Sequence, residues 1–275
     1  MRKKLASKII HKIVLAVFVV LLAFPFFWMA IATFKQDGDL YATKNNPFLF
    51  NLAPTLDHLR YLFGQTDYAR WLANTALVGV LVVAITLLLS IPAAYALARL
   101  TGRWGERLGI AIFLTYLVPP TLLFIPMSRV VAVLGLQDTI WSLVLVYPSI
   151  TIPFSTVILL AGRTAIPKEI PEAAAIDGAG FWRTLFQINL PMMVPIISVA
   201  VLFGTIFTFT DMTVVYILTA GGPYDSTQTL PSYAFATGIQ GSDLAAGAAV
   251  SLFLVPVLVL IAYLMLRLAH RAEVG

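Results

Sequence analysis

The chain of 275 residues contains a polar segment, residues 163–190, between two long apolar stretches. Pro171 and Glu172 suit the first turn of a helix, because proline is already shaped for that position and a carboxylate favours the positive end of the helix dipole. Ala173 and Ala174 continue the helix, and Gly178 can end it, since glycine adopts positive φ at little cost. The pattern predicts a helix whose carboxylate is placed for a charge-assisted contact with a basic group of another protein.

A second short helix is predicted to begin near residue 180. Its apolar face recurs at i, i+4 and i+7, at Phe181, Leu185 and Ile188. The polar side carries Arg183, Gln187 and Asn189. Two short helices at a sharp angle would present an apolar knob with charged edges, a shape that fits a groove on a partner protein. The alternative is an amphipathic segment that lies flat on a membrane surface.

A second group of chemically capable side chains lies in the apolar stretch 192–218. Its aromatic, hydroxyl and carboxylate members are Phe203, Thr205, Phe207, Thr208 and Asp211. Hydroxyls and a carboxylate can hydrogen-bond the hydroxyl groups of a sugar, and phenyl rings can pack on its ring. An acidic residue at membrane depth is costly and tends to face a cavity. Two alternatives stay open, because threonines also bond to nearby helix carbonyls and Asp211 can lie at the outer interface.

The usual signatures of an enzyme or a metal site are missing from the sequence. The three histidines, His11, His58 and His270, lack the spacing of a ligand pair. There is no Gly-x-Ser-x-Gly elbow and no Gly-x-x-x-x-Gly-Lys-Ser/Thr phosphate loop. The absence of cysteine excludes disulfides and thiolate chemistry. We therefore expect no catalytic residue, no metal site and no ATP-binding site in this chain.

The composition indicates which elements must hold these residues. The chain is 60% hydrophobic and 11% charged, with a mean hydropathy of +0.90, whereas soluble domains carry about 25% charged residues. Six apolar stretches reach the roughly 20 residues needed to cross a bilayer: 13–34, 72–98, 108–128, 140–161, 192–218 and 244–266. Because backbone groups in lipid must be satisfied internally, we predict an all-α polytopic membrane protein with six transmembrane helices. Pro119, Pro120 and Pro126 should kink or break the third helix, either for packing or to line a pathway.

The distribution of lysine and arginine predicts the orientation. Most of them fall on the side of the N-terminus and the polar segment, so both termini and residues 163–190 should be cytoplasmic. The first stretch mimics a signal peptide, but it continues past Pro25 and Trp28 without a small-x-small cleavage site, and we expect an uncleaved helix. The lysines and arginines gathered on the cytoplasmic side explain the pI near 9.5, so a nucleic-acid partner is not needed to account for it.

The polar segment resembles the cytoplasmic coupling loop, or EAA motif, of permease subunits in binding-protein-dependent ABC importers. The resemblance rests on Glu172-Ala173-Ala174, on Gly178 and on Ile188-x-Leu190-Pro191. It extends to residues 25–29, 71–75, 93–99, 119–126 and 166–169, which are similar to maltose-type carbohydrate permeases. The chain departs from the family at Phe209-Thr210-Asp211, where Trp-Asn-Asp is common. The resemblance implies the type I ABC importer permease fold, with an N-terminal region of residues 1–71, a core of residues 72–268 and a tail of residues 269–275.

The resemblance also implies partners and roles. Coupling to an ATPase would rest on Glu172, Ala173, Ala174, Asp177, Gly178, Phe181 and Arg183. The turn at Gly221, Gly222, Pro223 and Tyr224 either contacts an extracytoplasmic solute-binding protein or is a plain connector. The importer would comprise a second permease and two ATPase subunits that bind ATP and Mg²⁺, in the lipid bilayer of the bacterial inner membrane. A sugar, polyol or glycoside is the implied cargo, and its site can lie in either permease; the alternatives are a secondary transporter and an importer of the same fold for another solute.

Overall fold

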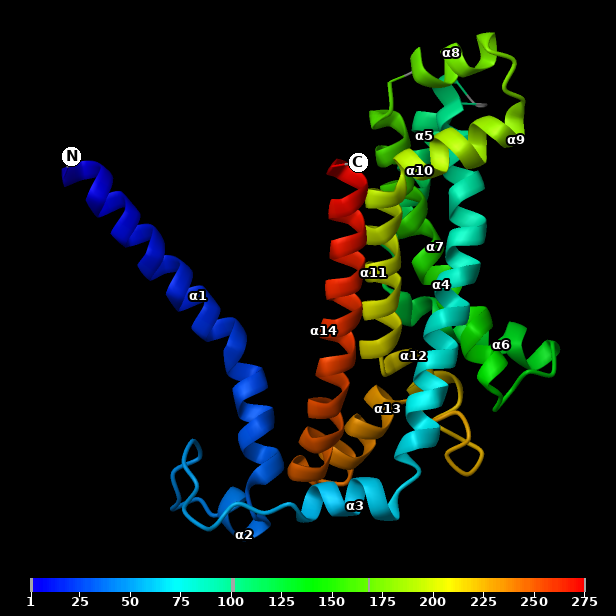
Figure 1. The fold of residues 1–275 in the computed structure, drawn as a ribbon. Coiled ribbons are helices and arrows are strands. Elements are labelled where there is room, and N and C mark those ends of the chain that lie inside the picture. The colour runs from blue at the N-terminus through cyan, green and yellow to red at the C-terminus, as the bar shows by residue number, and fades with distance from the viewer. Residues whose placement is uncertain (1, 100–101, 168, 275) are drawn as a thin grey trace. The chain divides into compact units, whose positions relative to one another are not determined.

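The structure is a computed structural model that describes the backbone of residues 2–99, 102–167 and 169–274. The side chains of residues 2–7, 103, 165, 171, 172, 175, 181 and 272–274 lie outside the description. Every regular element in the described ranges is a helix (Figure 1). The chain forms two compact units: Met1–Tyr68 with Tyr233–Val255 is unit 1, and Ala69–Ser232 with Pro256–Gly275 is unit 2.

Unit 1 contains one long apolar helix and several short polar ones. Its helices are α1 (Arg2–Phe34), α2 (Asp37–Leu40), α3 (Asp57–Gln65), the π-helix η2 (Ala236–Gln240) and the first turns of α14 (Leu244–Val274). The most apolar part of α1, within Lys8–Phe34, has a mean hydropathy of 2.7 and no residue buried inside the chain. A helix that is apolar on all sides and uncovered by its own chain is typical of a membrane span.

A buried ion pair organises the segment that follows α1. Lys35 and Asp39 lie 3.5 Å apart, and neither side chain is exposed. Asn45 and Asn51 each donate a side-chain hydrogen bond of 2.8 Å to Oδ1 of Asp39, while the backbone N–H groups of Asn51 and Leu52 donate to Oδ2. Desolvation by burial opposes ionisation, but these hydrogen bonds outweigh it and hold the pKa of Asp39 well below its usual range.

We predict that this segment depends on the charge of Asp39. Asp39→Asn leaves the Lys35 ammonium buried without its counter-charge, so limited proteolysis of the purified chain should cut residues 35–67 faster than in the wild type. Since folding lowers the pKa of Asp39, its stabilisation is present above the usual carboxyl pKa and is lost as the pH falls through that range toward the lower, folded value. Asp57→Asn is the matched control, because its ion pair with Arg60 is exposed. Equal cleavage of both variants would contradict the prediction.

Unit 2 is a helical bundle around α7. Its helices are α4 (Tyr68–Arg99), α5 (Arg103–Thr115), α6 (Pro120–Val133), α7 (Ile140–Ala165), α8 (Glu169–Ile176), α9 (Phe181–Thr184), the π-helix η1 (Leu185–Asn189), α10 (Leu190–Met192), α11 (Val194–Thr210), α12 (Thr213–Leu218) and the last turns of α14. Helices α5, α6, α11 and α12 all pack against α7. Helix α4 joins α7 through a buried hydrogen bond of 2.6 Å between Thr86 and Thr151.

Close packing of helices in unit 2 depends on small residues. A Cβ atom added to Gly79 of α4 would clash with the ring of Phe209, and one added to Gly162 of α7 would clash with Ile196. Both partners lie on α11. Small residues let helix backbones approach in a membrane, where lipid removes the hydrophobic driving force between helices. Helix α11 is therefore held between α4 and α7.

The predicted spans are confirmed in composition, the break that the prolines predicted in the third span is present, and the fifth span differs from the prediction in its extent. Four helices are long and apolar enough to cross a membrane, or up to six if each of two bent pairs is one span. The predicted third span is broken into α5 and α6, which meet at 90° beside Pro119, where the chain has no N–H to continue the helix. The predicted fifth span, 192–218, was wrong in its extent. Helix α11 ends at Thr210, because Asp211 has an extended backbone with φ −78° and ψ 126°.

Candidate functional site

The polar segment folds as two short helices joined by a tight turn at one end of unit 2 (Figure 1). Gly178 has φ +80°, and the N–H of Ala179 donates a 2.9 Å hydrogen bond to the carbonyl of Ala174. This six-to-one bond around a left-handed residue is the Schellman ending of a helix. A Cβ atom at Gly178 would meet nothing within 4 Å. The glycine is therefore required by backbone conformation and not by space.

The helix that follows agrees with the predicted polar side at Arg183 and Gln187 but not at Asn189. Arg183 Nε donates a 3.1 Å hydrogen bond to Gln187, and both side chains are exposed as predicted. Asn189, predicted on the same polar side, is 1% exposed. Trp182 and Phe186 are stacked with ring centroids 5.9 Å apart and are 68% and 58% exposed. The i→i+5 hydrogen bonding of the π-helix puts more than 3.6 residues in each turn and shifts the later positions round the axis, which explains why a 3.6-residue pattern placed Asn189 wrongly.

An apolar groove separates this second helix from α4. It has a volume of about 740 Å³ and is lined from α4 by Leu88, Pro92 and Tyr95, among others, and from the polar segment by Trp182 and Phe186. Tyr95 also lies under the guanidinium of the buried Arg163, which is 5.8 Å from its ring centroid. This cation–π contact gives Tyr95 a packing role beside the groove.

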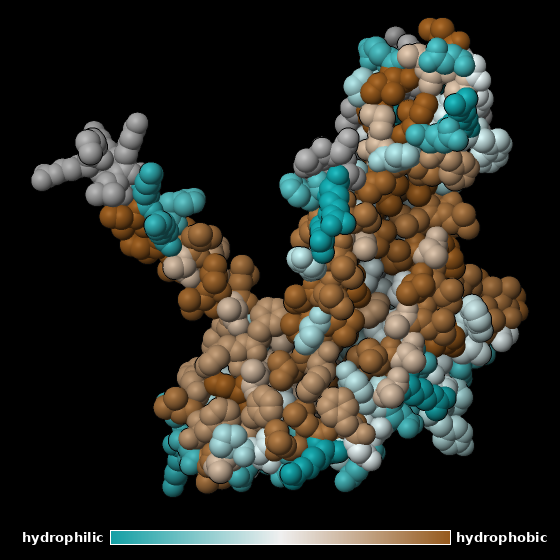
Figure 2. All heavy atoms as spheres, viewed as in Figure 1, coloured by the Kyte–Doolittle hydropathy of each residue, from teal (hydrophilic) through white to brown (hydrophobic). Residues whose placement is uncertain are grey.

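The predicted coupling residues form one exposed stretch. Ala173, Asp177, Gly178 and Arg183 are exposed, and Ala174 is half-buried. Ile176 between them is 87% exposed. Glu172 lies within α8 and Phe181 begins α9, but both side chains are outside the described residues of the structure. Figure 2 shows hydrophobic spheres open to the surroundings among hydrophilic ones at this end of unit 2.

The predicted pathway residues of α11 divide into two sets. Thr208 is 3% exposed, its hydroxyl donates 2.9 Å to the carbonyl of Gly204, and a Cβ at Gly79 would lie 3.3 Å from its Oγ1. Thr205 is also buried, at 8%. Thr208 therefore packs toward α4, which is the alternative interpretation of the sequence, and both threonines are buried within the described chain.

Aromatic side chains of α11 instead meet those of α7. The ring of Phe203 lies 3.7 Å, centroid to centroid, from that of Phe154, and 6.1 Å from Phe207. Phe207 in turn makes an edge contact at 6.3 Å with the buried Tyr147. The row Phe154, Phe203, Phe207 and Tyr147, hereafter the aromatic row, joins the two helices along one line. Its three phenylalanines are half-buried and keep some of each ring open.

The broken third span lies beside this row. Tyr116, between α5 and α6, has its ring 5.7 Å from Phe154. Tyr116 also lines a cavity of about 250 Å³ with Thr115, Pro120 and Ser149, among others. Ligand pockets for drug-sized molecules run from about 300 to 1,000 Å³, so the cavity is small for a whole sugar chain. The proline break thus opens space next to the aromatic row.

Asp211 terminates this row as a structural connector. Its Oδ2 accepts 3.0 Å hydrogen bonds from the hydroxyl of Tyr147 and from the backbone N–H of Val214 in the first turn of α12. The carboxylate therefore ties the start of α12 to α7, and its residue is half-buried. The sequence left open whether the Asp211 carboxylate faces a cavity or lies at the outer interface. Its two hydrogen bonds show a carboxylate that caps α12, which differs from a free carboxylate in a cavity.

The glycine-rich turn after α12 is held by side-chain hydrogen bonds. Asn74 donates two 2.9 Å bonds, to the carbonyls of Ser226 and Gln228, so it braces the turn. Gly221 has φ +84°. Tyr224 is 98% exposed at the tip. The turn therefore presents one aromatic side chain on a braced loop.

Sequence reasoning missed several of these residues. Tyr147 and Phe154 are seven positions apart and so lie on one face of α7, a spacing that could have marked them as partners of the aromatic residues at 203 and 207. Tyr116 had no comparable signal, because its place depends on the break between α5 and α6. The sequence also gave no sign that Asp37, His58 and Asp243 meet, since they come from distant segments.

Comparison with known proteins places these features in one family. The family model of the "Binding-protein-dependent transport system inner membrane component" matches residues 87–272. The diacetylchitobiose uptake system permease protein DasC of Streptomyces coelicolor is 26% identical over 100% of this chain and 99% of its own length. The galactooligosaccharides transport system permease protein GanQ of Bacillus subtilis is 30% identical over 70% of this chain and 68% of its own length.

Solved structures share the fold at low sequence identity. A chain of a bacterial ABC transporter involved in the import of the acidic polysaccharide alginate superposes with a TM-score of 0.77 at 18% identity, covering 96% of this chain and 97% of its own. A chain of the MetNI methionine ABC transporter superposes with a TM-score of 0.60 at 17% identity, covering 78% and 97%. With a family model that spans most of the bundle, this chain belongs to the family of inner membrane components of binding-protein-dependent transport systems.

Proposed function

We propose that the chain is one permease subunit of an ATP-driven importer that carries a sugar, polyol or glycoside across the bacterial inner membrane. The observation that carries the proposal is the exposed segment from α8 through Gly178 to α9, in a chain of this family. Its relatives are named for diacetylchitobiose, galactooligosaccharides and maltodextrin, which supports a carbohydrate cargo. The proposed partners are a second permease, an extracytoplasmic binding protein and two ATPase subunits that bind ATP and Mg²⁺. This chain would hold no cofactor and catalyse no reaction.

The coupling step follows from the geometry of the polar segment. The Schellman turn at Gly178 fixes the direction in which α9 leaves α8, so a displacement of α8 by an ATPase is passed on and not absorbed. We propose that Glu172 pairs with a basic ATPase residue while Ala173 and Ala174 fill its cleft. The 71° bend between Trp182–Met192 and α11 then turns the push into a movement of α11.

Movement of α11 would act on the aromatic row. Phe203 and Phe207 lie on α11 and face Phe154 and Tyr147 of α7. A shift between the two helices would separate or close these rings, and phenyl faces can pack on sugar rings without demanding charge. We propose the aromatic row, with the cavity at Tyr116, as this subunit's share of the solute path. Asp211 would keep the end of the row in place.

The proposed topology has both termini and residues 163–190 in the cytoplasm and the turn at Gly221–Tyr224 outside. In this scheme residues 1–71 add a first span and an external segment to the core at 72–268, and 269–275 form a cytoplasmic tail. The turn at Gly221, Gly222, Pro223 and Tyr224 is proposed to contact the binding protein, because its braced backbone exposes a single tyrosine.

Cysteine labelling tests the topology, since the natural chain has no cysteine. A membrane-impermeant maleimide should label Tyr224→Cys from outside intact cells and should reach Ala179→Cys only after the membrane is opened. Ala179→Cys is the critical variant, because α8 and α9 must face a cytosolic ATPase. Labelling of Ala179→Cys from outside would overturn both the orientation and the coupling role.

Co-purification tests the function itself. An importer subunit should carry ATPase subunits through detergent extraction and affinity purification, and the binding protein should then stimulate ATP hydrolysis. Uptake that requires the binding protein, with competition by candidate oligosaccharides, identifies the cargo class. A chain that transports alone in proteoliposomes driven by an ion gradient would instead be a secondary transporter, and the proposal would be wrong.

A further inference from the structure

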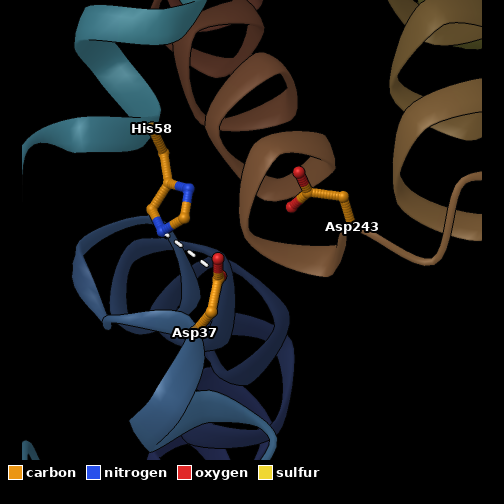
Figure 3. Close-up of side chains that lie close together, drawn as sticks. All are labelled: Asp37, His58 and Asp243. Carbon is orange, nitrogen blue, oxygen red and sulfur yellow. Dashed lines mark ion pairs between the residues drawn. The ribbon is translucent and has the colours of Figure 1, made fainter.

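Three ligand-bearing side chains from separate segments of unit 1 meet at one place (Figure 3). Asp37 begins α2, His58 lies in the first turn of α3, and Asp243 precedes α14. One ligand atom of each lies within 4.8 Å of those of the other two. Imidazole nitrogen and carboxylate oxygen are both accepted ligands of Zn²⁺.

His58 is oriented as a metal-binding histidine should be. Its Nε2 lies 3.0 Å from the backbone carbonyl oxygen of Lys35, and the residue is 9% exposed. Because a carbonyl oxygen can only accept, Nε2 carries a hydrogen, and in the tautomer with one ring hydrogen the lone pair lies on Nδ1. Figure 3 shows the Nδ1 edge of the ring turned toward Asp243. Ligating histidines ordinarily donate their second N–H to a carbonyl or carboxylate, which fixes the ring.

The two carboxylates differ in freedom. Oδ1 of Asp243 accepts a 2.9 Å hydrogen bond from the N–H of Ala246 at the start of α14, so its carboxylate is held in place. Asp37 has a side chain 64% exposed, and its Oδ1 lies 3.7 Å from Nε2, the nitrogen that faces the carbonyl of Lys35, so the carboxylate must swing toward Nδ1 to share an ion with that nitrogen. Ligands about 2.0–2.1 Å from a tetrahedral Zn²⁺ lie about 3.3 Å from one another. The cluster must therefore close by up to about 1.5 Å, and rotation of the exposed Asp37 side chain can supply that movement.

A tyrosine already ties the ligand segments together. The hydroxyl of Tyr41, the residue after α2, donates 2.9 Å to the carbonyl of Ser242 and accepts 2.8 Å from the N–H of Leu244. The backbone on both sides of Asp243 is thus bonded to the segment that carries Asp37. The ligand segments are held near one another without an ion, which lowers the ordering cost of binding one.

We propose that Asp37, His58 and Asp243 bind one divalent transition-metal ion, with Zn²⁺ as the best fit and water in the fourth position. The ion clamps the segment after α1 to the start of α14, within unit 1. This site is independent of the proposed coupling and solute path, and it departs from the expectation of no metal site. The sequence alone does not reveal this site, because His58 lies 21 positions after Asp37 and Asp243 lies 185 positions after His58.

The test is a titration of the full chain with ZnCl₂. The chain, in nanodiscs with any subunits that accompany it, is freed of metal by chelation and then titrated by calorimetry. One Zn²⁺ per chain should bind, and Asp37→Asn or His58→Ala should weaken its dissociation constant at least about tenfold. Asp37→Asn is the decisive variant, because its side chain is exposed and the substitution keeps the size of that side chain. His270→Ala is the control, since it removes a histidine outside the cluster.

A thermal readout distinguishes a bound ion from unspecific association. Saturating Zn²⁺ should raise the unfolding temperature of the wild type and of His270→Ala, because an ion that binds only the folded chain stabilises it. At the same Zn²⁺ concentration it should raise the unfolding temperature of Asp37→Asn clearly less, because a weaker dissociation constant gives a smaller stabilisation. If wild type and Asp37→Asn take up Zn²⁺ equally, or neither does, the metal site is refuted, and the cluster is instead an ion pair between His58 and the carboxylates.

Discussion

Gly178→Val should reduce uptake about 5- to 150-fold and weaken the stimulation of ATPase activity by the binding protein to a similar degree. The residue has φ +80° in the turn that ends α8. A side chain in the left-handed region costs about 1–3 kcal/mol, and each 1.4 kcal/mol is a factor of ten in the population of the correct turn. A β-branched residue is among the worst for this conformation. Uptake by the assembled importer and its ATPase activity in nanodiscs measure the effect.

The neighbouring glycine provides a matched control. Gly180 also has open space around it, but its φ is not in the left-handed region. Gly180→Val adds the same side chain two positions away and should leave uptake within about twofold, because surface substitutions without a special feature usually change little. Gly178→Asn should be intermediate, since asparagine tolerates positive φ better than other residues. Wild-type coupling in Gly178→Val, with normal assembly, would remove the turn from the mechanism.

Asp211→Leu should destabilise the chain by at least about 1–3 kcal/mol, the cost of leaving the buried Tyr147 hydroxyl without a partner. Tyr147 is 1% exposed, and Asp211 Oδ2 accepts its hydrogen bond at 3.0 Å. The same oxygen also caps Val214, so the variant loses a second hydrogen bond. Thermal unfolding in detergent, with expression level as a second readout, measures the loss.

Asparagine at this position separates a structural role from a cargo contact. The amide oxygen in Asp211→Asn can still accept hydrogen bonds from Tyr147 and Val214. If Asp211 is a connector, uptake should therefore change less than about twofold and the unfolding temperature should stay close to that of the wild type. A drop of about 10- to 150-fold in uptake, which equals a lost charged hydrogen bond of about 1.5–3 kcal/mol, would mean that the carboxylate touches cargo.

A double-mutant cycle and a ring deletion complete this test. Tyr147→Phe removes the hydroxyl that Asp211→Leu would orphan, so the double variant should be less destabilised than the sum of the two single ones. Phe207→Ala should lower uptake while ATPase subunits still assemble, because it opens the middle of the aromatic row. Near-normal uptake in Phe207→Ala would place the cargo site in the partner permease.

The sequence by itself determined the class of the protein and the presence of its long helices, although α1 and α14 extend well beyond the predicted apolar stretches. Uninterrupted apolar runs of about 20 residues have only the helix available in lipid, so α1, α4, α7 and α14 could be predicted from composition. The turn at Gly178 could also be predicted from the residues next to it in the sequence. A proline and a carboxylate at one end of a run of alanines, and a glycine at the other, specify a short capped helix, and the φ of Gly178 is the expected left-handed one.

Only the tertiary structure decided what the helices bring together. The extent of α11 could not be predicted, because hydropathy continues past Asp211 while the Asp211 hydrogen bonds to Tyr147 and Val214 favour a break. The faces of α11 were also undetermined, since an all-round apolar helix in a membrane has no polar side to orient it. Close approach at Gly79 and Gly162 turns Thr208 toward α4, and Phe203 and Phe207 lie toward α7. The cluster of Asp37, His58 and Asp243 depends on three distant segments, and no local pattern records contacts over such separations.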